Sequence, residues 1–279
     1  MGLGAGRASL AGAAFALAFT VLDLLFIVFL NDWGDREVDA IKRRMFPRGG
    51  SPKTIPDRIL PARHLLAAGL AAGAGALGVA WAAEVTLDRP GLTLASLFSL
   101  GIFVAYTLPP LRLNYRGGGE LLEMLGVGVV LPWLSAYLQG GELFARGMWL
   151  LPGFAILSLA SAIASGLSDE RSDREGGKRT FVTTFGNALA RRGVEALLVL
   201  GALAWVAPAL AGLLPLWLAA PPAALALAHW VPLRRASSAA VTDAFDAQKR
   251  YKLHLHHAIW RGAQLAAAAL AFHHLWLGR

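Results

Sequence analysis

Long apolar segments alternate with short polar loops along almost the whole chain. Eight of them approach the length that a bilayer requires, and they cover residues 9–30, 65–83, 92–108, 121–138, 148–166, 193–207, 215–231 and 258–276. Prolines interrupt the pattern between residues 208 and 222, which is typical of a hairpin between two spans. The pattern predicts an all-α fold, a polytopic membrane bundle of about eight transmembrane helices. We expect residues 1–279 to form a single membrane-embedded domain.

Positive charge is distributed unequally between the two sides of this predicted bundle. All but five of the 26 Lys and Arg residues lie in the loops 31–64, 109–119, 167–192 and 232–257, which fall on one side. Cytoplasmic loops of membrane proteins carry an excess of Lys and Arg. We therefore expect an integral protein of a bacterial inner membrane whose basic side faces the cytoplasm, with both chain ends on the other side.

Composition narrows the possible chemistry. Hydrophobic residues make up 56% of the chain and charged residues 16%, and there is no cysteine. Metal ligands must therefore be oxygen atoms or histidine, and a disulfide framework is excluded. The net charge of +8 does not indicate nucleic-acid binding, because the cations lie in loops between spans and are not interleaved with exposed aromatic residues.

Two acidic stretches stand where an apolar segment meets a basic loop. Residues 31–39 read Asn-Asp-Trp-Gly-Asp-Arg-Glu-Val-Asp, and residues 169–173 read Asp-Glu-Arg-Ser-Asp. If these stretches are helical, their four-residue spacing places Asn31, Asp35 and Asp39 on one stripe, and the two aspartates of the second stretch on another. Both stretches fall on the basic side, so they can face each other across one site.

Carboxylate and amide oxygens in this arrangement suggest a magnesium site for a polyanion. Magnesium is normally held by one or two protein carboxylates together with phosphate oxygens of a substrate. Bound metal makes diphosphate a better leaving group, because fixed positive charge matches the negative charge that develops on it. Basic residues close to the motifs are candidates for binding the phosphates, namely Lys42, Arg43, Arg44, Arg112, Arg116, Lys178 and Arg179.

The chain resembles the UbiA superfamily of intramembrane prenyltransferases. That family is known by an Asn-Asp-x-x-Asp-x-x-x-Asp stretch at one helix end and an Asp-x-x-x-Asp stretch four helices later, and residues 31–39 and 169–173 match both in order. Residues 177–180 with Gly186 resemble the stretch that trails the second motif. Residues 106–113 resemble a third signature, whose tyrosine and basic residue lie near the diphosphate. The resemblance extends over nearly the whole sequence.

The resemblance implies a helical bundle around a cavity that is open to lipid on one side. An isoprenyl diphosphate would place its head at a magnesium site and its tail in the apolar interior, and ionisation would give an allylic carbocation. An aromatic or other lipophilic acceptor would attack this cation and then lose a proton. The implied metal ligands are Asp35, Asp39, Asp169 and Asp173, supported by Asn31 and Asp32, and the implied diphosphate-binding residues are Asn31, Lys42, Arg43, Arg112, Lys178 and Arg179.

Tyr106 is the remaining residue that the resemblance implicates in catalysis. Its ring could stabilise positive charge, or its hydroxyl could assist the diphosphate. Two departures from the family pattern stand beside these matches. Members generally place two spans before the first motif and nine in total, so either the true start lies upstream of Met1 or this chain is a shortened member that lacks the family's first helix. Gly166 stands where many members carry another polar or acidic residue.

The residues leave the acceptor and the outcome of the reaction open. Residues 31–41 resemble the motif of chlorophyll-type synthases, and residues 116–120 resemble quinone-pathway enzymes that prenylate naphthoate or benzoate rings. A membrane terpene cyclase would ionise the same substrate and trap the cation internally, but the intact aspartate motifs favour transfer. A non-catalytic carrier of phosphorylated lipid would be expected to show inverted repeats with broken helices, and the sequence shows no clear ones.

Three acidic residues outside the motifs have simpler interpretations. Asp23 lies within the first apolar segment, and we expect it to form a structural hydrogen bond to another helix. Glu120 and Glu123 follow a run of three glycines, which is typical of a turn that enters a helix with acidic residues near its start.

Overall fold

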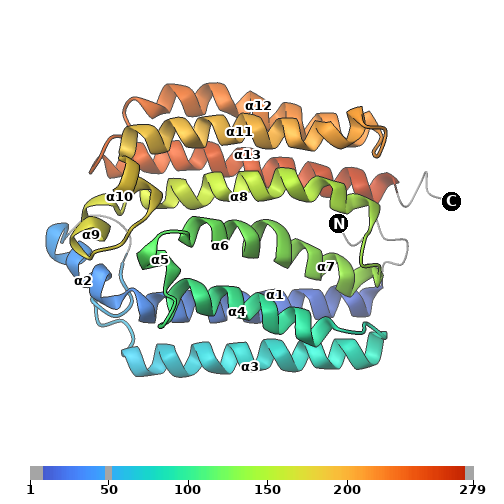
Figure 1. Cartoon of the computed structure of the whole chain (residues 1–279), viewed down its shortest axis with the longest axis horizontal. Helices are drawn as coiled ribbons and strands as arrows, with labels where there is room; N and C mark the ends of the chain where they lie inside the picture. The colour runs from blue at the N-terminus through green and yellow to red at the C-terminus, as the bar shows by residue number, and fades with distance from the viewer. Residues whose placement is uncertain (1–8, 48–51, 274–279) are drawn as a thin grey trace.

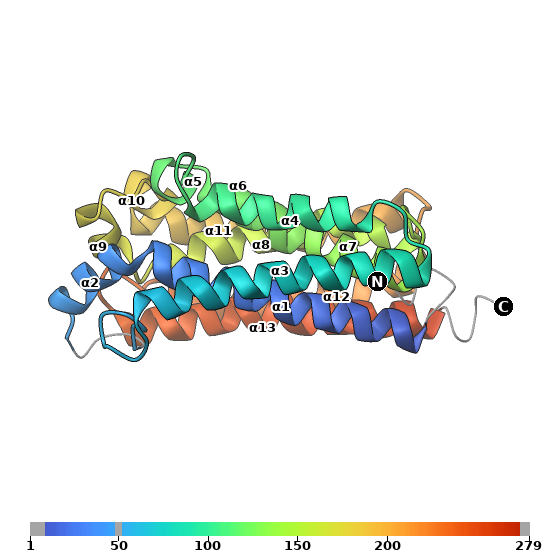
Figure 2. The same ribbon diagram turned by 90° about the horizontal axis from the view of Figure 1, so that it is seen from below.

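The structure is a computed structural model that describes residues 9–47 and 52–273, and its regular secondary structure within those ranges is helical. The long helices lie side by side, and the short helices α2, α5, α9 and α10 gather at one end of the bundle (Figure 1). A view turned by 90° places the same short helices at the same end (Figure 2). This end carries the two acidic motifs.

The bounds of the helices follow the apolar pattern closely. The long elements are α1 (Leu10–Gly34), α3 (Ala62–Leu87), α4 (Leu92–Thr107), α8 (Leu151–Gly166), α11 (Asn187–Leu210), α12 (Leu216–Ser237) and α13 (Phe245–Phe272). One further long element consists of α6 (Gly119–Leu125), a π-helical turn (Gly126–Val130) and α7 (Leu131–Gly140). The short elements are α2 (Arg36–Met45), α5 (Leu113–Arg116), a 3₁₀ turn (Arg146–Leu150), α9 (Glu170–Glu175) and α10 (Phe181–Phe185).

Every predicted apolar segment overlaps one of the long elements. Within the described ranges, six helices are long and apolar enough to cross a membrane, and they start at residues 10, 62, 119, 146, 187 and 216. α4 is apolar but shorter, and α13 is not among the six. The last predicted segment also extends to residue 276, outside the described residues. The all-helical membrane bundle is therefore confirmed, whereas the number of eight spans is not.

The two largest hydrophobic cores lie in different halves of the bundle, which Figure 1 shows as layers. The larger core joins α8, α11, α12 and α13, and it contains the fully buried side chains of Trp205 and Tyr251. The second joins α1, α3, α4 and α7, around Phe19 and Leu134. The π-helical turn lies against α8 and connects the halves. An added Cβ at Gly128 in that turn would lie only 2.7 Å from the Cα of Ala155.

The first acidic motif spans a break between α1 and α2, so the continuous helix that a single stripe would require is interrupted at Asp35. α1 ends at Gly34, where an added Cβ would lie 2.6 Å from Oγ1 of Thr107. Arg112 Nη2 donates to the carbonyl oxygen of Gly34 at 2.9 Å, which satisfies an acceptor at the end of the helix. Asp39 therefore lies on the separate helix α2.

The second motif is likewise divided from the helix that precedes it. α8 ends at Gly166, and Asp169 stands at the N-cap position of α9. The motifs thus occupy the last turn of α1 and the turns and short helices at the bundle end, where their side chains can converge from different directions.

Close packing between α8 and α11 depends on glycine, which gives a stability prediction. An added Cβ at Gly153 would lie 2.3 Å from Cδ1 of Trp205 and 2.9 Å from the carbonyl oxygen of Gly201. We expect Gly153→Ala to lower the free energy of unfolding in mixed micelles by about 1–3 kcal/mol, because the two helices must move apart.

The matched control is Gly78→Ala in α3, where an added Cβ meets no atom within 4 Å. Since alanine favours helix over glycine, this variant is expected to be neutral or more stable by about 0.5–1 kcal/mol. An equal loss in both variants would contradict the packing argument.

Candidate functional site

A polar cavity of about 290 Å³ lies at the bundle end that carries the short helices. Side chains from α1, α2, α4, α5, α6, α8 and α9 line it. Both acidic motifs contribute, and the members that line the cavity are Asn31, Asp32, Asp35, Asp39, Asp169 and Asp173. The structure therefore brings the two motifs to one site, although they are far apart in the sequence.

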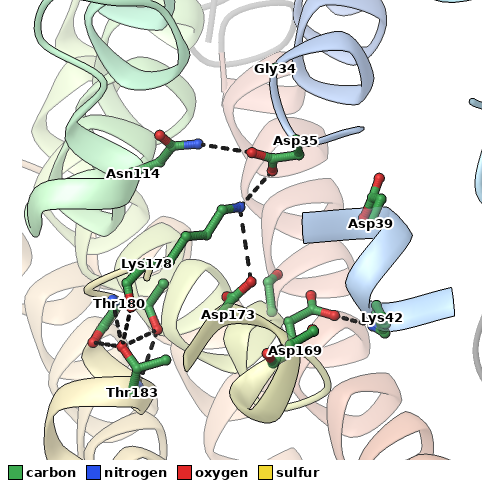
Figure 3. A network of polar contacts seen from close by, with 12 residues as sticks. Gly34, Asp35, Asp39, Lys42, Asn114, Asp169, Asp173, Lys178, Thr180 and Thr183 are labelled. Atoms are coloured by element: carbon green, nitrogen blue, oxygen red, sulfur yellow. Dashed lines mark hydrogen bonds and ion pairs between the residues drawn. The ribbon is translucent and has the colours of Figure 1, made fainter. Parts of the chain in front are cut away.

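Lys178 stands between the two motifs and connects them. Its Nζ lies 2.7 Å from Oδ2 of Asp35 and 4.0 Å from Oδ1 of Asp173, and all three side chains are largely buried. Figure 3 shows the lysine reaching between these two carboxylates. Asn114 Nδ2 approaches the other oxygen of Asp35 at 3.4 Å. The carboxylate of Asp35 is thus fixed from two sides.

Two further lysines pair with the remaining aspartates. Lys42 forms an ion pair with Asp169, and Nζ of Lys53 lies 2.5 Å from Oδ1 of Asp39. Lys53 comes from the segment between α2 and α3, and sequence reasoning did not identify it. In the same segment Oγ1 of Thr54 donates to Oδ2 of Asp32 at 2.5 Å. Lys53 and Thr54 therefore contact the first motif, and Lys53 adds a positive charge to the site.

Burial makes ionised carboxylates costly in this cavity. Burial raises the pKa of Asp173 to about 7, and the positive charge of Lys178 only partly offsets this effect. Burial also raises the pKa of Asp39 above its ordinary value, although Lys53 lowers it. A further cation in the cavity would stabilise the ionised forms of both groups.

The connection between α9 and α10 holds Lys178 in place through its backbone. The amide of Lys178 donates to the carbonyl oxygen of Asp173 at 2.8 Å, and the amide of Arg179 donates to that of Tyr115 at 3.1 Å. α10 then begins with a capping box formed by Thr180 and Thr183. The backbone contacts of this connection therefore hold Lys178 in its position between the two motifs.

Of the seven basic candidates for binding the phosphates, the five arginines are not among the described residues that line the cavity. Arg43 Nη2 donates to Oδ2 of Asp57 at 2.6 Å. Arg112 caps Gly34, and its guanidinium lies 3.6 Å from the centroid of the Tyr115 ring. Neither arginine, nor Arg179, is among the described residues that line the cavity. The geometry gives the cavity's positive charge to three lysines instead, Lys42, Lys53 and Lys178.

A second, apolar cavity of about 340 Å³ adjoins the polar one. Its walls include Ile27, Val28, Phe103 and Leu131. Residues that line both cavities mark their boundary, and they are Asn31, Asp32, Tyr106 and Glu123. The ring of Tyr106 stacks on Phe103 with 5.8 Å between centroids. A molecule with a charged head and an apolar tail would fit across this boundary.

Glu120 and Glu123 lie near the start of α6, as the sequence predicted, after Gly117 and Gly118 with positive φ. Both also line the polar cavity, which the sequence did not indicate. Glu120 Oε1 accepts a hydrogen bond from the amide of Phe181 at 2.6 Å, so this residue fixes α10 against α6.

The donor atoms of the polar cavity are of the kind that magnesium prefers. They are carboxylate and amide oxygens, and Oδ1 of Asn31 is buried without a hydrogen-bond partner. In the described part of the chain, no three His, Asp or Glu side chains stand close enough together to form a ready metal site. The residue types fit a divalent cation, provided that the carboxylates exchange their lysine partners for it.

Known proteins give an independent comparison. A family model described as "UbiA prenyltransferase family" matches residues 2–259, which confirms the resemblance drawn from the motifs. Chlorophyll synthase of Arabidopsis thaliana is 29% identical over 162 residues, which cover 58% of this chain and 41% of the relative. The 1,4-dihydroxy-2-naphthoate octaprenyltransferase of Escherichia coli (strain K12) is 30% identical over 201 residues, covering 68% of this chain and 63% of the relative. The chain thus spans less than half the length of the plant enzyme.

The fold also matches a solved structure. A UbiA homolog from Archaeoglobus fulgidus, described as bound to DMAPP and Mg²⁺, superposes with a TM-score of 0.68 over 95% of this chain and 92% of the other, at 18% identity. At this identity the likeness concerns the fold.

The buried pairing of Lys178 gives a prediction about the site in the absence of metal. Lys178→Met leaves Asp35 and Asp173 buried near each other without their shared cation. We expect the free energy of unfolding in EDTA to fall by about 3–5 kcal/mol. Arg171→Met is the control, because its pair with Asp243 is exposed and should contribute far less. Equal effects of the two substitutions would refute the proposed importance of the buried pair.

Proposed function

The chain belongs to the UbiA prenyltransferase family, and we propose that it transfers an isoprenyl chain from its diphosphate to an aromatic or other lipophilic acceptor, with release of diphosphate. The observation that carries this proposal is the boundary between the two cavities. A cavity lined by aspartates and lysines adjoins an apolar one, and Tyr106 lines both. An isoprenyl diphosphate has the same division between a charged head and an apolar tail.

The polar cavity would bind the diphosphate head together with magnesium. When bound, magnesium would supply fixed positive charge that stabilises the departing diphosphate. The residues proposed to hold it are Asp35, Asp39, Asp169 and Asp173, with Asn31 and Asp32 in support. Their oxygen donors and the unsatisfied Oδ1 of Asn31 support this assignment.

The three lysines would bind the phosphate oxygens. Lys42, Lys53 and Lys178 each pair with an aspartate of the motifs, so the cavity holds charges of both signs in contact. A metal cation would complement the negative carboxylates, and a diphosphate would complement the positive lysines. The carboxylates can therefore turn to the metal and the lysines to the phosphates, while the charge balance of the cavity is kept.

The bond that breaks would lie at the boundary of the cavities. The electron pair of the bond between the first carbon and the phosphate oxygen leaves with the diphosphate, and positive charge develops on that carbon. The ring of Tyr106 stands at this boundary, and an aromatic face attracts positive charge. The acceptor atom then forms the new bond and loses its proton. We assign Tyr106 to stabilisation of the cation through its ring.

The relatives and the charge distribution support the wider setting. Chlorophyll synthase and 1,4-dihydroxy-2-naphthoate octaprenyltransferase are the names of the similar proteins, and the solved homolog is described with DMAPP and Mg²⁺. The site lies at the bundle end that carries the basic loops 31–64 and 167–192. We propose that this end faces the cytoplasm of a bacterial inner membrane.

The first test is an assay of the purified chain in nanodiscs with magnesium. Geranyl, farnesyl and geranylgeranyl diphosphates are supplied with and without aromatic acceptors, and release of diphosphate is measured. We expect acceptor-dependent release that Asp35→Ala and Asp173→Ala each reduce at least about a hundredfold. Glu37→Ala is the control, because this exposed residue lies between Asp35 and Asp39 but does not line the cavity. Its rate should match the wild type.

Other outcomes of the same assay would replace the proposal. A hydrocarbon product formed without acceptor identifies a terpene cyclase. Magnesium-dependent binding of the diphosphates without turnover identifies a carrier of phosphorylated lipid. Equal loss of activity in the Glu37→Ala variant would show that the aspartates act only through the negative charge that they add to this end of the protein.

Lys53 offers a separate test of the diphosphate site. Lys53→Met removes one of the charges proposed to contact phosphate, so we expect the Kd for geranyl diphosphate with magnesium to rise about tenfold. Arg44→Met is the control, since Arg44 is exposed on α2 and does not line the cavity. A change of the same size in both variants would mean that Lys53 acts only through the overall charge. The measurement is titration calorimetry in detergent.

A further inference from the structure

Asp23 is a buried carboxyl group in the wall of the apolar cavity. Its side chain lies in the middle of α1 and the residue is 3% exposed, yet it lines the cavity. The sequence suggested a structural hydrogen bond to another helix. In the described part of the chain, however, no hydrogen bond or ion pair reaches Asp23. A carboxyl group held in an apolar membrane interior is costly unless it meets a partner, and such residues usually mark functional sites.

The position of Asp23 gives the apolar cavity a second polar end. Along α1, the lining residues run from Asn31 and Asp32 through Val28, Ile27 and Leu24 to Asp23. Eight helical residues correspond to about 12 Å. Ser99 of α4 is also buried and lines the same cavity. The cavity is therefore polar at the boundary with the aspartate motifs, apolar in its middle, and polar again at Asp23.

An isoprenyl tail offers nothing to this second polar end, because it contains no hydrogen-bonding group. A ring compound with an apolar body and a polar substituent would match the length of the cavity and would lie in it beside the isoprenyl tail. Its reactive atom would lie near Tyr106 and its substituent near Asp23. Since buried polar groups in proteins are normally hydrogen-bonded, a ligand group is the partner that Asp23 lacks.

We propose that Asp23, with Ser99, binds the acceptor substrate by accepting a hydrogen bond from a hydroxyl or N–H group on the acceptor's ring system. An ionised carboxylate only accepts hydrogen bonds, and a serine hydroxyl both donates and accepts. A free carboxylate at that position of the acceptor is disfavoured, because it would bring two like charges together in an apolar cavity. The inference rests on the proposed function and assigns Asp23 a positioning role, with no part in the bond-forming step.

Binding of three small probes to the full chain in detergent micelles tests this role without requiring turnover. The probes are 1-naphthol, naphthalene and 1-naphthoate, which share a ring system and differ in the polar group. Equilibrium dialysis gives their dissociation constants for the wild type, Asp23→Leu, Asp23→Asn and Ser99→Ala. Ile27→Val serves as the control, because Ile27 lines the same cavity on the same helix and has no polar group.

We expect the wild type to bind 1-naphthol about tenfold more tightly than naphthalene, and Asp23→Leu to remove this preference. Ser99→Ala should reduce it in part. Asp23→Asn keeps a hydrogen-bond acceptor oxygen but loses the negative charge. It should therefore retain the affinity for 1-naphthol and bind 1-naphthoate more tightly than the wild type does. Ile27→Val should change the affinities for all three probes by a similar factor.

The proposal is overturned if the wild type does not bind 1-naphthol more tightly than naphthalene, or if Asp23→Leu weakens the binding of all three probes by the same factor. If Asp23→Leu fails to fold, the affinity of Asp23→Asn for 1-naphthoate decides. The proposal is then overturned if Asp23→Asn binds 1-naphthoate no more tightly than the wild type does. Magnesium-dependent binding of geranyl diphosphate is measured on the same wild-type sample. Its absence would count against the proposed function, whereas the probe pattern decides the role of Asp23 separately.

Discussion

The structure depends on holding many carboxylates together in a poorly solvated place. Two aspartate motifs converge at one end of the bundle, and burial is the largest of the effects that together raise the pKa of Asp173 to about 7. Three lysines offset part of this charge, each from a different segment. Much of the surrounding architecture serves this arrangement. Arg112 donates a hydrogen bond to the carbonyl oxygen of Gly34, the last residue of α1. Glu120 accepts a hydrogen bond from the amide of Phe181 at the start of α10, the helix that follows Lys178. Such a cluster is ready to exchange its internal cations for a metal and a phosphate group.

The two cavities place the charged site directly beside an apolar space. The polar cavity and the apolar cavity share Tyr106 and Glu123 in their walls, so the boundary between them is a defined place in the protein. In the proposed function, ionisation of an isoprenyl diphosphate would separate charge at this boundary. A carboxyl group at the far end of the apolar cavity, Asp23, adds a third feature that no isoprenyl tail explains.

Local patterns in the sequence predicted most of the fold and the centre of the site. Apolar segments of bilayer length become helices because each satisfies its own backbone hydrogen bonds, and the motif spacing indicated the family. Residues that depend on packing between distant segments escaped prediction. Lys53 pairs with Asp39 from a position outside the helices, and Arg112 contacts the backbone of Gly34 and is not among the described residues that line the cavity. The close approach of Gly34 to Thr107 likewise depends on another helix.

An experimental structure with magnesium and the unreactive analogue geranyl thiodiphosphate tests the proposed exchange of partners at the aspartate motifs most directly. We expect magnesium at about 2.1 Å from oxygens of both aspartate motifs, Lys178 turned from Asp35 to the phosphate, and the geranyl tail beginning beside Tyr106. A diphosphate bound elsewhere, with Lys178 still paired to Asp35, would contradict the exchange of partners on which the proposed function rests.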